Sequence, residues 1–119
     1  MQPLHTVAST AAFLAQARAD GMSEGELEAL ERMLSANPEA GDLIVGSGGC
    51  RKVRVAGKGR GKSGGFRVVT FFAHAGLPVY LLAMLSKGRR ANFSAAEVAA
   101  MATLAKRILA AGTRGRQGH

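Results

Sequence analysis

The sequence has no acidic residue between positions 43 and 96. Its eight acids all lie outside that span: Asp20, Glu24, Glu26, Glu28, Glu31, Glu39, Asp42 and Glu97. A nuclease that uses magnesium needs several carboxylates converging on the ion as hard oxygen ligands. The central part of the chain cannot supply them, so we expect neither a metal site nor a cofactor.

The sequence also has few cysteines and no long apolar run. Its one cysteine, Cys50, excludes an internal disulfide, has no Cys or His partner at zinc-ligand spacing and predicts a small buried residue. The first ten residues lack the pattern of a signal peptide, and the most apolar run, residues 76–85, is only as long as a strand. We therefore expect a cytoplasmic protein with no membrane partner.

What the chain does have is positive charge. Its 16 Lys and Arg residues give a net charge of +8, which favours a polyanionic partner. The acid-free span contains ten of these cations: Arg51, Lys52, Arg54, Lys58, Arg60, Lys62, Arg67, Lys87, Arg89 and Arg90. Protein surfaces usually mix charges of both signs, so this segment predicts a surface that binds phosphates.

The stretch GKGRGKSGGFR, residues 57–67, resembles a nucleotide-binding P-loop but does not fit the pattern. The P-loop consensus G-x-x-x-x-G-K-[ST] would need glycine at position 56, which is Ala56. The residues that follow, GGFRVVTFF, are β-branched and aromatic, so they predict a strand where a P-loop requires a helix. An ATPase is therefore disfavoured.

Three helices are predicted. Ser9 or Thr10 would begin the first, which ends near Gly21. Ser23 and Glu26 form a capping box for a second helix that ends at residues 37–38. Its inner face is predicted to carry Leu27, Leu30, Met33 and Leu34. Ser94 and Glu97 form another capping box for a third helix. Its core residues are predicted to be Val98, Met101, Leu104, Ala105, Ile108 and Leu109.

Strands are predicted at residues 4–8, 50–56, 66–73 and 79–85. In residues 50–56, Lys52 and Arg54 alternate with Val53 and Val55, which predicts one cationic face. The order predicts an α+β fold in a single domain over residues 1–111, with residues 112–119 as a disordered basic tail. Its antiparallel or mixed sheet of about four strands would carry all helices on one face and the basic side chains on the other.

A cationic surface of this kind has two uses. RNA carries its own nucleophile, the 2′-hydroxyl, so a protein that aligns the strand and stabilises the extra charge on the phosphorane could cleave it without metal. Arginine suits charge stabilisation, and a lysine among other cations has a lowered pKa suited to proton transfer. The same residues could equally only bind phosphate. His74, in a predicted turn, is expected to be a solvated histidine.

Six motifs in order resemble the RelE/ParE superfamily of bacterial toxins, most closely its HigB-type branch. They are NPEAGDLI, the GSGG segment with RK and R after it, GRGKSGG, RVV, a lysine after the last central strand, and NFS at the start of the final helix. The similarity extends from about Leu4 to Leu109.

This resemblance implies a RelE-like fold and a toxin that enters the ribosomal A site and cuts translated mRNA without a metal. It also implies a cognate helix-turn-helix antitoxin as partner, with operator DNA bound only through that antitoxin. By position, Arg67, Lys62 and Lys87 match the catalytic residues. Contacts to RNA would come from six other cations of the cluster: Lys52, Arg54, Lys58, Arg60, Arg89 and Arg90.

One position departs from the family pattern. Many relatives have tyrosine two residues before the lysine, where this chain has Leu85. Tyr80, five residues away in the same predicted strand, is expected to face the opposite side. Two alternatives therefore remain beside an mRNA endonuclease: a ParE-like gyrase inhibitor, disfavoured by the basic cluster, and a catalytically weak RNA- or ribosome-binding relative.

Overall fold

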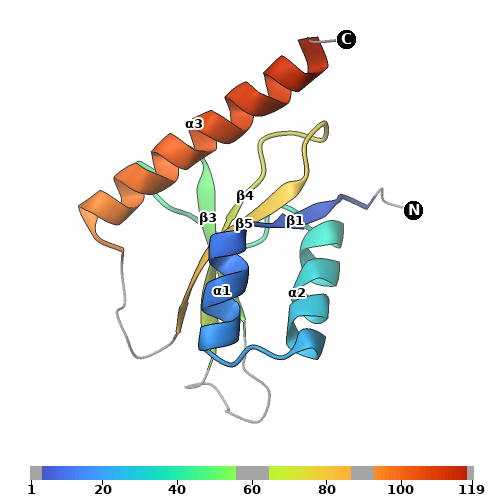
Figure 1. Cartoon of the computed structure of the whole chain (residues 1–119), viewed down its shortest axis with the longest axis vertical. Helices are drawn as coiled ribbons and strands as arrows, with labels where there is room; N and C mark the ends of the chain where they lie inside the picture. The colour runs from blue at the N-terminus through green and yellow to red at the C-terminus, as the bar shows by residue number, and fades with distance from the viewer. Residues whose placement is uncertain (1–3, 56–64, 87–92, 118–119) are drawn as a thin grey trace.

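The computed structural model describes residues 4–55, 65–86 and 93–117 and has an α+β fold (Figure 1). Over these residues the chain forms a five-stranded mixed sheet and three helices. In chain order the elements are β1 (Val7–Ser9), α1 (Ala11–Ala19), α2 (Glu24–Ala36), β2 (Asp42–Leu43), β3 (Cys50–Val55), β4 (Phe66–Phe71), β5 (Val79–Ser86) and α3 (Ala95–Gln117). The two-residue strand β2 was not predicted, and it adds the fifth strand.

The helices begin where their capping residues predict. Thr10 is the N-cap of α1, and its side chain accepts a hydrogen bond from the amide of Phe13. Ser23 and Glu26 form the complete capping box of α2. In the same way, the Ser94 amide donates to the Glu97 carboxylate and the Glu97 amide donates to the Ser94 hydroxyl, which fixes the start of α3.

The strands follow the order β1-β5-β4-β3-β2. Strands β2 to β5 pair antiparallel, and β3, β4 and β5 form the expected meander. The N-terminal strand β1 instead pairs parallel with β5, so β5 has a neighbour on both sides. This agrees with the uninterrupted apolar run of β5, which buries side chains on both faces.

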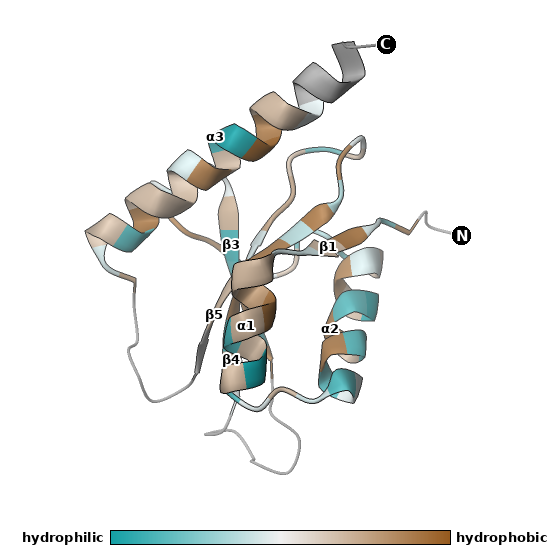
Figure 2. Cartoon of the chain, viewed as in Figure 1, coloured by the Kyte–Doolittle hydropathy of each residue, from teal (hydrophilic) through white to brown (hydrophobic). Residues whose placement is uncertain are grey.

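One core lies between the sheet and the pair α1 and α2. Phe13 of α1 and Leu30 and Leu34 of α2 pack there against Val53 and Val68 of the sheet. Figure 2 shows the apolar side of α2 turned toward α1 and the sheet, with its charged side outward. Met33, predicted to lie on the inner face, is 36% exposed and does not belong to this core.

Helix α3 packs on the opposite face of the sheet, so the prediction that all helices share one face was wrong. Met101 and Ala105 of α3 form a second core with Cys50, Val69 and Phe71. On β4, Val69 and Phe71 of this second core alternate with Phe66 and Val68 of the first core. Both faces of β4 are therefore apolar and need a cover.

The ends of α3 differ from expectation in two ways. Leu109, predicted as a core residue, is 37% exposed. The helix also continues to Gln117, so its last turns cover most of the segment for which we expected no regular structure.

A glycine-rich loop, residues 44–49, lets α3 lie close to the sheet. Gly48 has a φ of +77°, and a Cβ there would lie 3.5 Å from the Cα of Ala102 and 3.6 Å from the Cβ of Ala105. Glycine adopts this left-handed conformation without a steric penalty. Because position 48 has no side chain, α3 can pack directly against this loop.

Candidate nucleic-acid interface

Two arginines lie directly opposite each other on neighbouring strands. Arg54 of β3 pairs with Arg67 of β4, and Arg67 pairs in turn with Leu85 of β5. Arg54 is exposed and Arg67 is half-buried. These three positions form a row across the sheet, one step from its end, where Val55, Phe66 and Ser86 pair.

Lys52 extends this row along β3. It lies two residues from Arg54, about 7 Å away along the strand, and pairs with Val69 of the second core. Lys52, Arg54 and Arg67 thus share the face of the sheet that carries α3. This confirms the predicted alternation, in which Val53 points to the other face and packs with α1 and α2. We call Lys52, Arg54 and Arg67 the cationic row.

The backbone beneath the cationic row is held rigidly. Val53, Phe66 and Val68, which alternate with the cations on the same strands, are each at most 5% exposed. A small shift of either arginine would therefore disturb the packed core on the other face. The arginine backbones are fixed before any ligand binds.

The electrostatics of the row favour an anion. Like charges directly opposite each other in an antiparallel pair are unfavourable. A phosphate that contacts both Arg54 and Arg67 would be attracted to two positive charges. Because the guanidinium fork matches two phosphate oxygens, arginine is well suited to hold such a group.

A β-bulge in β5 sets which residues face the cationic row. The register shifts between Val69, which pairs with Ala83, and Thr70, which pairs with Leu81, so Leu82 has no partner on β4. As a result Tyr80 pairs with Phe71 and lies on the same face as Arg67. The prediction that Tyr80 faces the opposite side was wrong because an extra residue reverses the alternation.

Tyr80 is nevertheless distant from the row. Phe71, its partner, lies four residues from Arg67 on β4, which corresponds to about 13 Å along the strand. The tyrosine ring packs against the second core beneath α3. It therefore belongs to the packing of the helix.

A protein-family model described as the RelE toxin of the RelE / RelB toxin-antitoxin system matches residues 6–115. The chain belongs to the RelE toxin family. It is accordingly the toxin component of a toxin–antitoxin system, and membership of this family implies a cognate antitoxin as partner.

Six cations that we predicted for the site of this RelE toxin lie outside the described residues: Lys58, Arg60, Lys62, Lys87, Arg89 and Arg90. They fall in two segments, 56–64 and 87–92. The first connects β3 to β4, and the second follows β5. Val55, Phe66 and Ser86, the strand residues nearest these segments in the sequence, pair at the end of the sheet beside Arg54 and Arg67.

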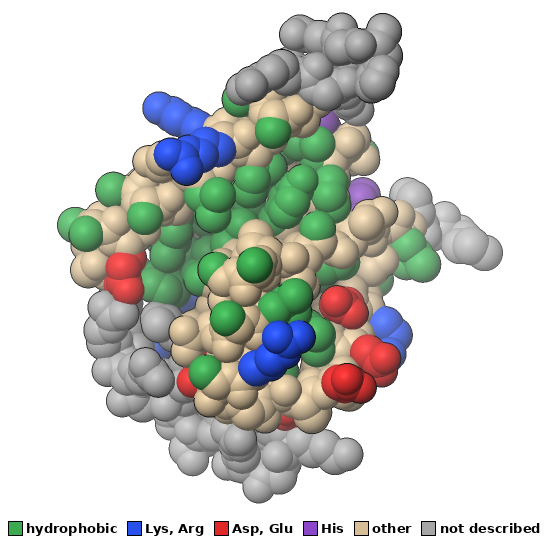
Figure 3. Space-filling view, viewed as in Figure 1, with side chains coloured by type: hydrophobic (Ala, Val, Ile, Leu, Met, Phe, Trp, Pro, Cys, Tyr) green, Lys and Arg blue, Asp and Glu red, His purple; other side chains and the backbone are tan. Residues whose placement is uncertain are grey.

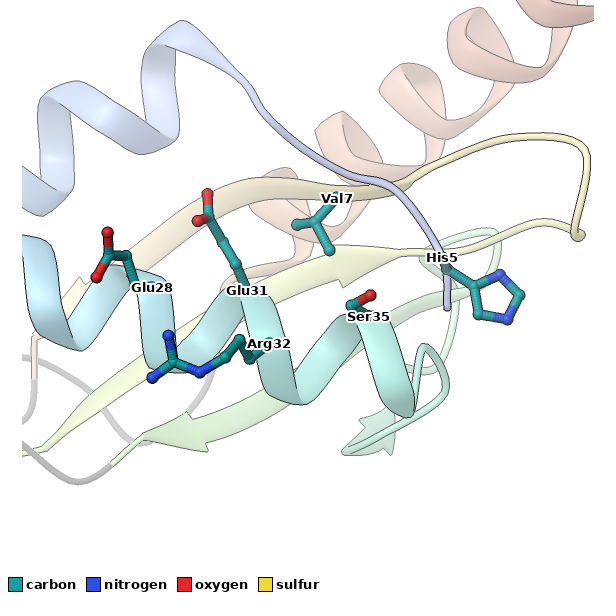
Figure 4. Close-up of a pocket in the computed structure, with 6 residues that line it drawn as sticks. All are labelled: His5, Val7, Glu28, Glu31, Arg32 and Ser35. Carbon is teal, nitrogen blue, oxygen red and sulfur yellow. The ribbon is translucent and has the colours of Figure 1, made fainter. Parts of the chain in front are cut away.

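An open cavity of about 470 Å³ in this RelE-family toxin lies away from this interface. It lies between α2 and the N-terminal segment and is lined by His5, Val7, Glu28, Glu31, Arg32 and Ser35 (Figure 4). The His5 ring lies at the far end of the cavity from Glu28. That ring packs edge-on against Phe72 with centroids 5.1 Å apart, which indicates a structural role.

Neither a metal site nor a membrane span is found among the described residues of this RelE-family toxin. Residues 4–55, 65–86 and 93–117 contain no group of three His, Cys, Asp or Glu side chains placed to hold a metal. No helix within those ranges is long and apolar enough to cross a membrane. As predicted, Cys50 is buried, and its burial raises the pKa of the thiol above the ordinary value of 9.0.

Sequence reasoning missed two residues that shape the interface. Thr10 was recognised only as a possible helix cap, but its side chain also contacts the bulge in β5. Phe93 was noted only within the NFS motif, but it lines a cavity together with Lys52. No local pattern could have found either contact, because each joins segments far apart in the chain.

Proposed function

We propose that this RelE-family toxin belongs to the HigB-like branch and is a ribosome-dependent, metal-independent mRNA endonuclease that inhibits translation. Its partners would be the ribosome with its mRNA and a helix-turn-helix antitoxin, through which alone it would contact operator DNA. Such a toxin would act in the cytoplasm.

The observation that carries this proposal is the pairing of Arg54 with Arg67 on a rigid sheet. Arginines at two directly paired positions can hold one phosphate between them, because each guanidinium fork matches phosphate oxygens. The arrangement therefore supports binding of a phosphodiester and stabilisation of the additional charge that develops on it.

The chemistry would use the RNA strand's own nucleophile. The 2′-oxygen attacks the adjacent phosphorus as a base removes its proton, and the bond from phosphorus to the 5′-oxygen breaks as an acid protonates that oxygen. The products are a 2′,3′-cyclic phosphate and a 5′-hydroxyl. We assign charge stabilisation to Arg67, proton transfer to Lys62 or Lys87, and RNA binding to Lys52, Arg54, Lys58, Arg60, Arg89 and Arg90.

A second candidate is a toxin that binds RNA or the ribosome and cleaves weakly. It is favoured by the residue at position 85, which pairs with Arg67 and is leucine. A leucine can neither donate a proton nor stack as an aromatic ring. The rate of cleavage separates the two candidates.

The proposal is tested by inducing the protein in cells and mapping the 5′ ends of transcripts. New ends confined to translated frames are expected for the unmodified chain. Arg67→Ala should lower their yield by roughly 10²-fold or more, the usual cost of removing a group that stabilises transition-state charge.

Arg18→Ala is the matched control, because Arg18 is exposed on α1, on the other side of the sheet. It should leave the cuts unchanged. Growth arrest with intact transcripts would contradict the endonuclease, and arrest accompanied by double-strand DNA breaks would favour a gyrase inhibitor.

A further inference from the structure

A small cavity of about 250 Å³ adjoins the cationic row at Lys52. It opens between the edge strand β2, the loop that follows it and the start of α3. Its lining consists of Asp42, Leu43, Ile44, Val45, Lys52, Phe93 and Val98. Most of these side chains are apolar, although the cavity borders the cationic row at Lys52.

The apolar lining is left open to solvent. Leu43 is 59% exposed and Val45 is 92% exposed, which makes them two of the most exposed large hydrophobic side chains of the described residues. Phe93 is half-buried and presents part of its ring to the same cavity. Exposed apolar groups gathered around one cavity indicate a binding site more strongly than groups scattered singly.

The walls of the cavity are fixed by hydrogen bonds of the neighbouring residues. The buried Ser47 hydroxyl donates to the carbonyl of Ile44 at 2.6 Å and accepts from the amide of Cys50 at 3.0 Å. On the other side, the capping box of Ser94 and Glu97 holds the backbone directly after Phe93. The cavity is therefore preformed, which reduces the entropy lost when a ligand binds.

We propose that this cavity binds one nucleobase of the RNA strand whose phosphates lie on the cationic row. The inference rests on the proposed function and adds a site of base recognition to it. Lys52 belongs both to the row and to the cavity, so a base entering here stays attached to a strand held by Arg54 and Arg67. The phosphate next to that base would lie about 7 Å along β3.

The chemistry of the lining fits a base better than other ligands. A base has two flat π-faces, which pack well on an aromatic ring and aliphatic side chains. The edge of the base carries hydrogen-bond donors and acceptors, which can pair with the Asp42 carboxylate and the Lys52 ammonium. The volume is below the range of about 300–1,000 Å³ that holds drug-sized molecules, which suits one ring system.

The test measures binding of the full-length toxin to two labelled probes. One is a short unstructured oligoribonucleotide, and the other has the same length and charge but abasic riboses. Fluorescence anisotropy should show that Phe93→Leu and Leu43→Ala each weaken binding of the first probe by about 5-fold or more, the range for loss of base stacking. Neither substitution should change binding of the abasic probe.

Leu4→Ala is the matched control, since Leu4 is 75% exposed but lies in the N-terminal segment and lines a different cavity. It should bind both probes like the unmodified toxin. An unchanged urea unfolding midpoint for Phe93→Leu shows that its effect is not a loss of folding.

Three results would overturn the inference. If the unmodified toxin binds both probes equally while Arg67→Ala weakens both, the cavity takes no base but the cationic row still binds RNA. If the unmodified toxin binds neither probe, the cavity takes no base from free RNA and the subsite fails, whereas the proposed function is judged separately by the transcript 5′ ends. If the variants still bind both probes but no longer bind the antitoxin, the cavity is a binding site for a protein partner.

Discussion

At the scale of single residues, position 85 is the one that bears most directly on the proposed catalysis. The register places it beside Arg67, and the resemblance to the RelE/ParE superfamily leads us to expect tyrosine there. A phenol can donate a proton and its ring can stack on a base, whereas leucine offers only apolar contact. The register would place a tyrosine at position 85 beside Arg67, so one substitution tests what that side chain contributes.

We predict that Leu85→Tyr increases the rate of RNA cleavage. A positioned group that transfers protons contributes about 10²-fold or more in other enzymes, and we expect at least ~10-fold here. The measurement is the single-turnover rate on a programmed ribosome. Leu85→Phe separates the two roles, because it restores an aromatic ring without the hydroxyl.

Tyr80→Phe serves as the control for that experiment. Tyr80 is on the same face as Arg67 but packs beneath α3, so removing its hydroxyl should leave the rate unchanged. A large loss of activity in Tyr80→Phe would mean that the chain has recruited its own tyrosine in place of the family's.

At the scale of elements, one side chain joins α1 to the bulge of β5. The Thr10 hydroxyl lies 3.0 Å from the carbonyl oxygen of Leu81 and 3.2 Å from that of Leu82, and it accepts from the Phe13 amide. The Thr10 amide also donates to Leu81. The residue that begins the first helix therefore also stabilises the bulge that sets the alignment of position 85 with Arg67.

We predict that Thr10→Val lowers the free energy of unfolding by about 2 kcal/mol. The substitution keeps the shape but removes the helix cap and the donor to the bulge, which are each worth about 1 kcal/mol. Urea unfolding measures the change. Thr10→Ser should restore most of the stability, and a valine variant as stable as threonine would contradict the role of the hydroxyl.

The sequence predicted the elements better than their arrangement. Helix starts depend on residues three positions apart, so Ser23 with Glu26 and Ser94 with Glu97 could be read directly. Lys52 and Arg54 were likewise assigned to one face from strand alternation alone. Short sequence patterns of this kind are enough to predict where a helix begins and which face of a strand a side chain occupies.

What could not be predicted depends on contacts between distant segments. The side of the sheet that α3 covers follows from Val69 and Phe71, but an apolar run such as VVTFF does not state which helix packs on which face. The bulge at Leu82 has no glycine or proline to mark it, and it reversed the predicted side of Tyr80. In the candidate site, the pairing of Arg54 with Arg67 required the register of two strands.

At the scale of the whole molecule, acids predominate on one side of the sheet and the cationic row lies on the other. Four of the eight acids lie on α2, which packs on one face. The cationic row lies on the other face. Figure 3 shows acidic side chains gathered over α2 on the side turned to the viewer. Repulsion from the acidic side and attraction to the cationic side would both favour one orientation toward a polyanion.

We predict that RNA binding weakens steeply with salt and that each cation of the row contributes to the slope. For single-stranded nucleic acid, the plot of log K against log salt concentration changes by about 0.7 per phosphate contact. Lys52→Ala should therefore reduce the slope by ~0.7. Arg18→Ala, which removes a charge on the opposite side, should leave it unchanged, and equal effects of both would contradict a localised interface.

The division of charge should also affect the rate at which the toxin associates with its target. A molecule with its positive and negative sides separated experiences a torque in the field of a ribosome, before the two surfaces touch. The toxin would then collide with the ribosome with Lys52, Arg54 and Arg67 already turned toward the RNA. A larger fraction of collisions would therefore lead to a bound complex. Reversing charges on α2 would slow this encounter even though α2 lies on the other side of the sheet from the cationic row.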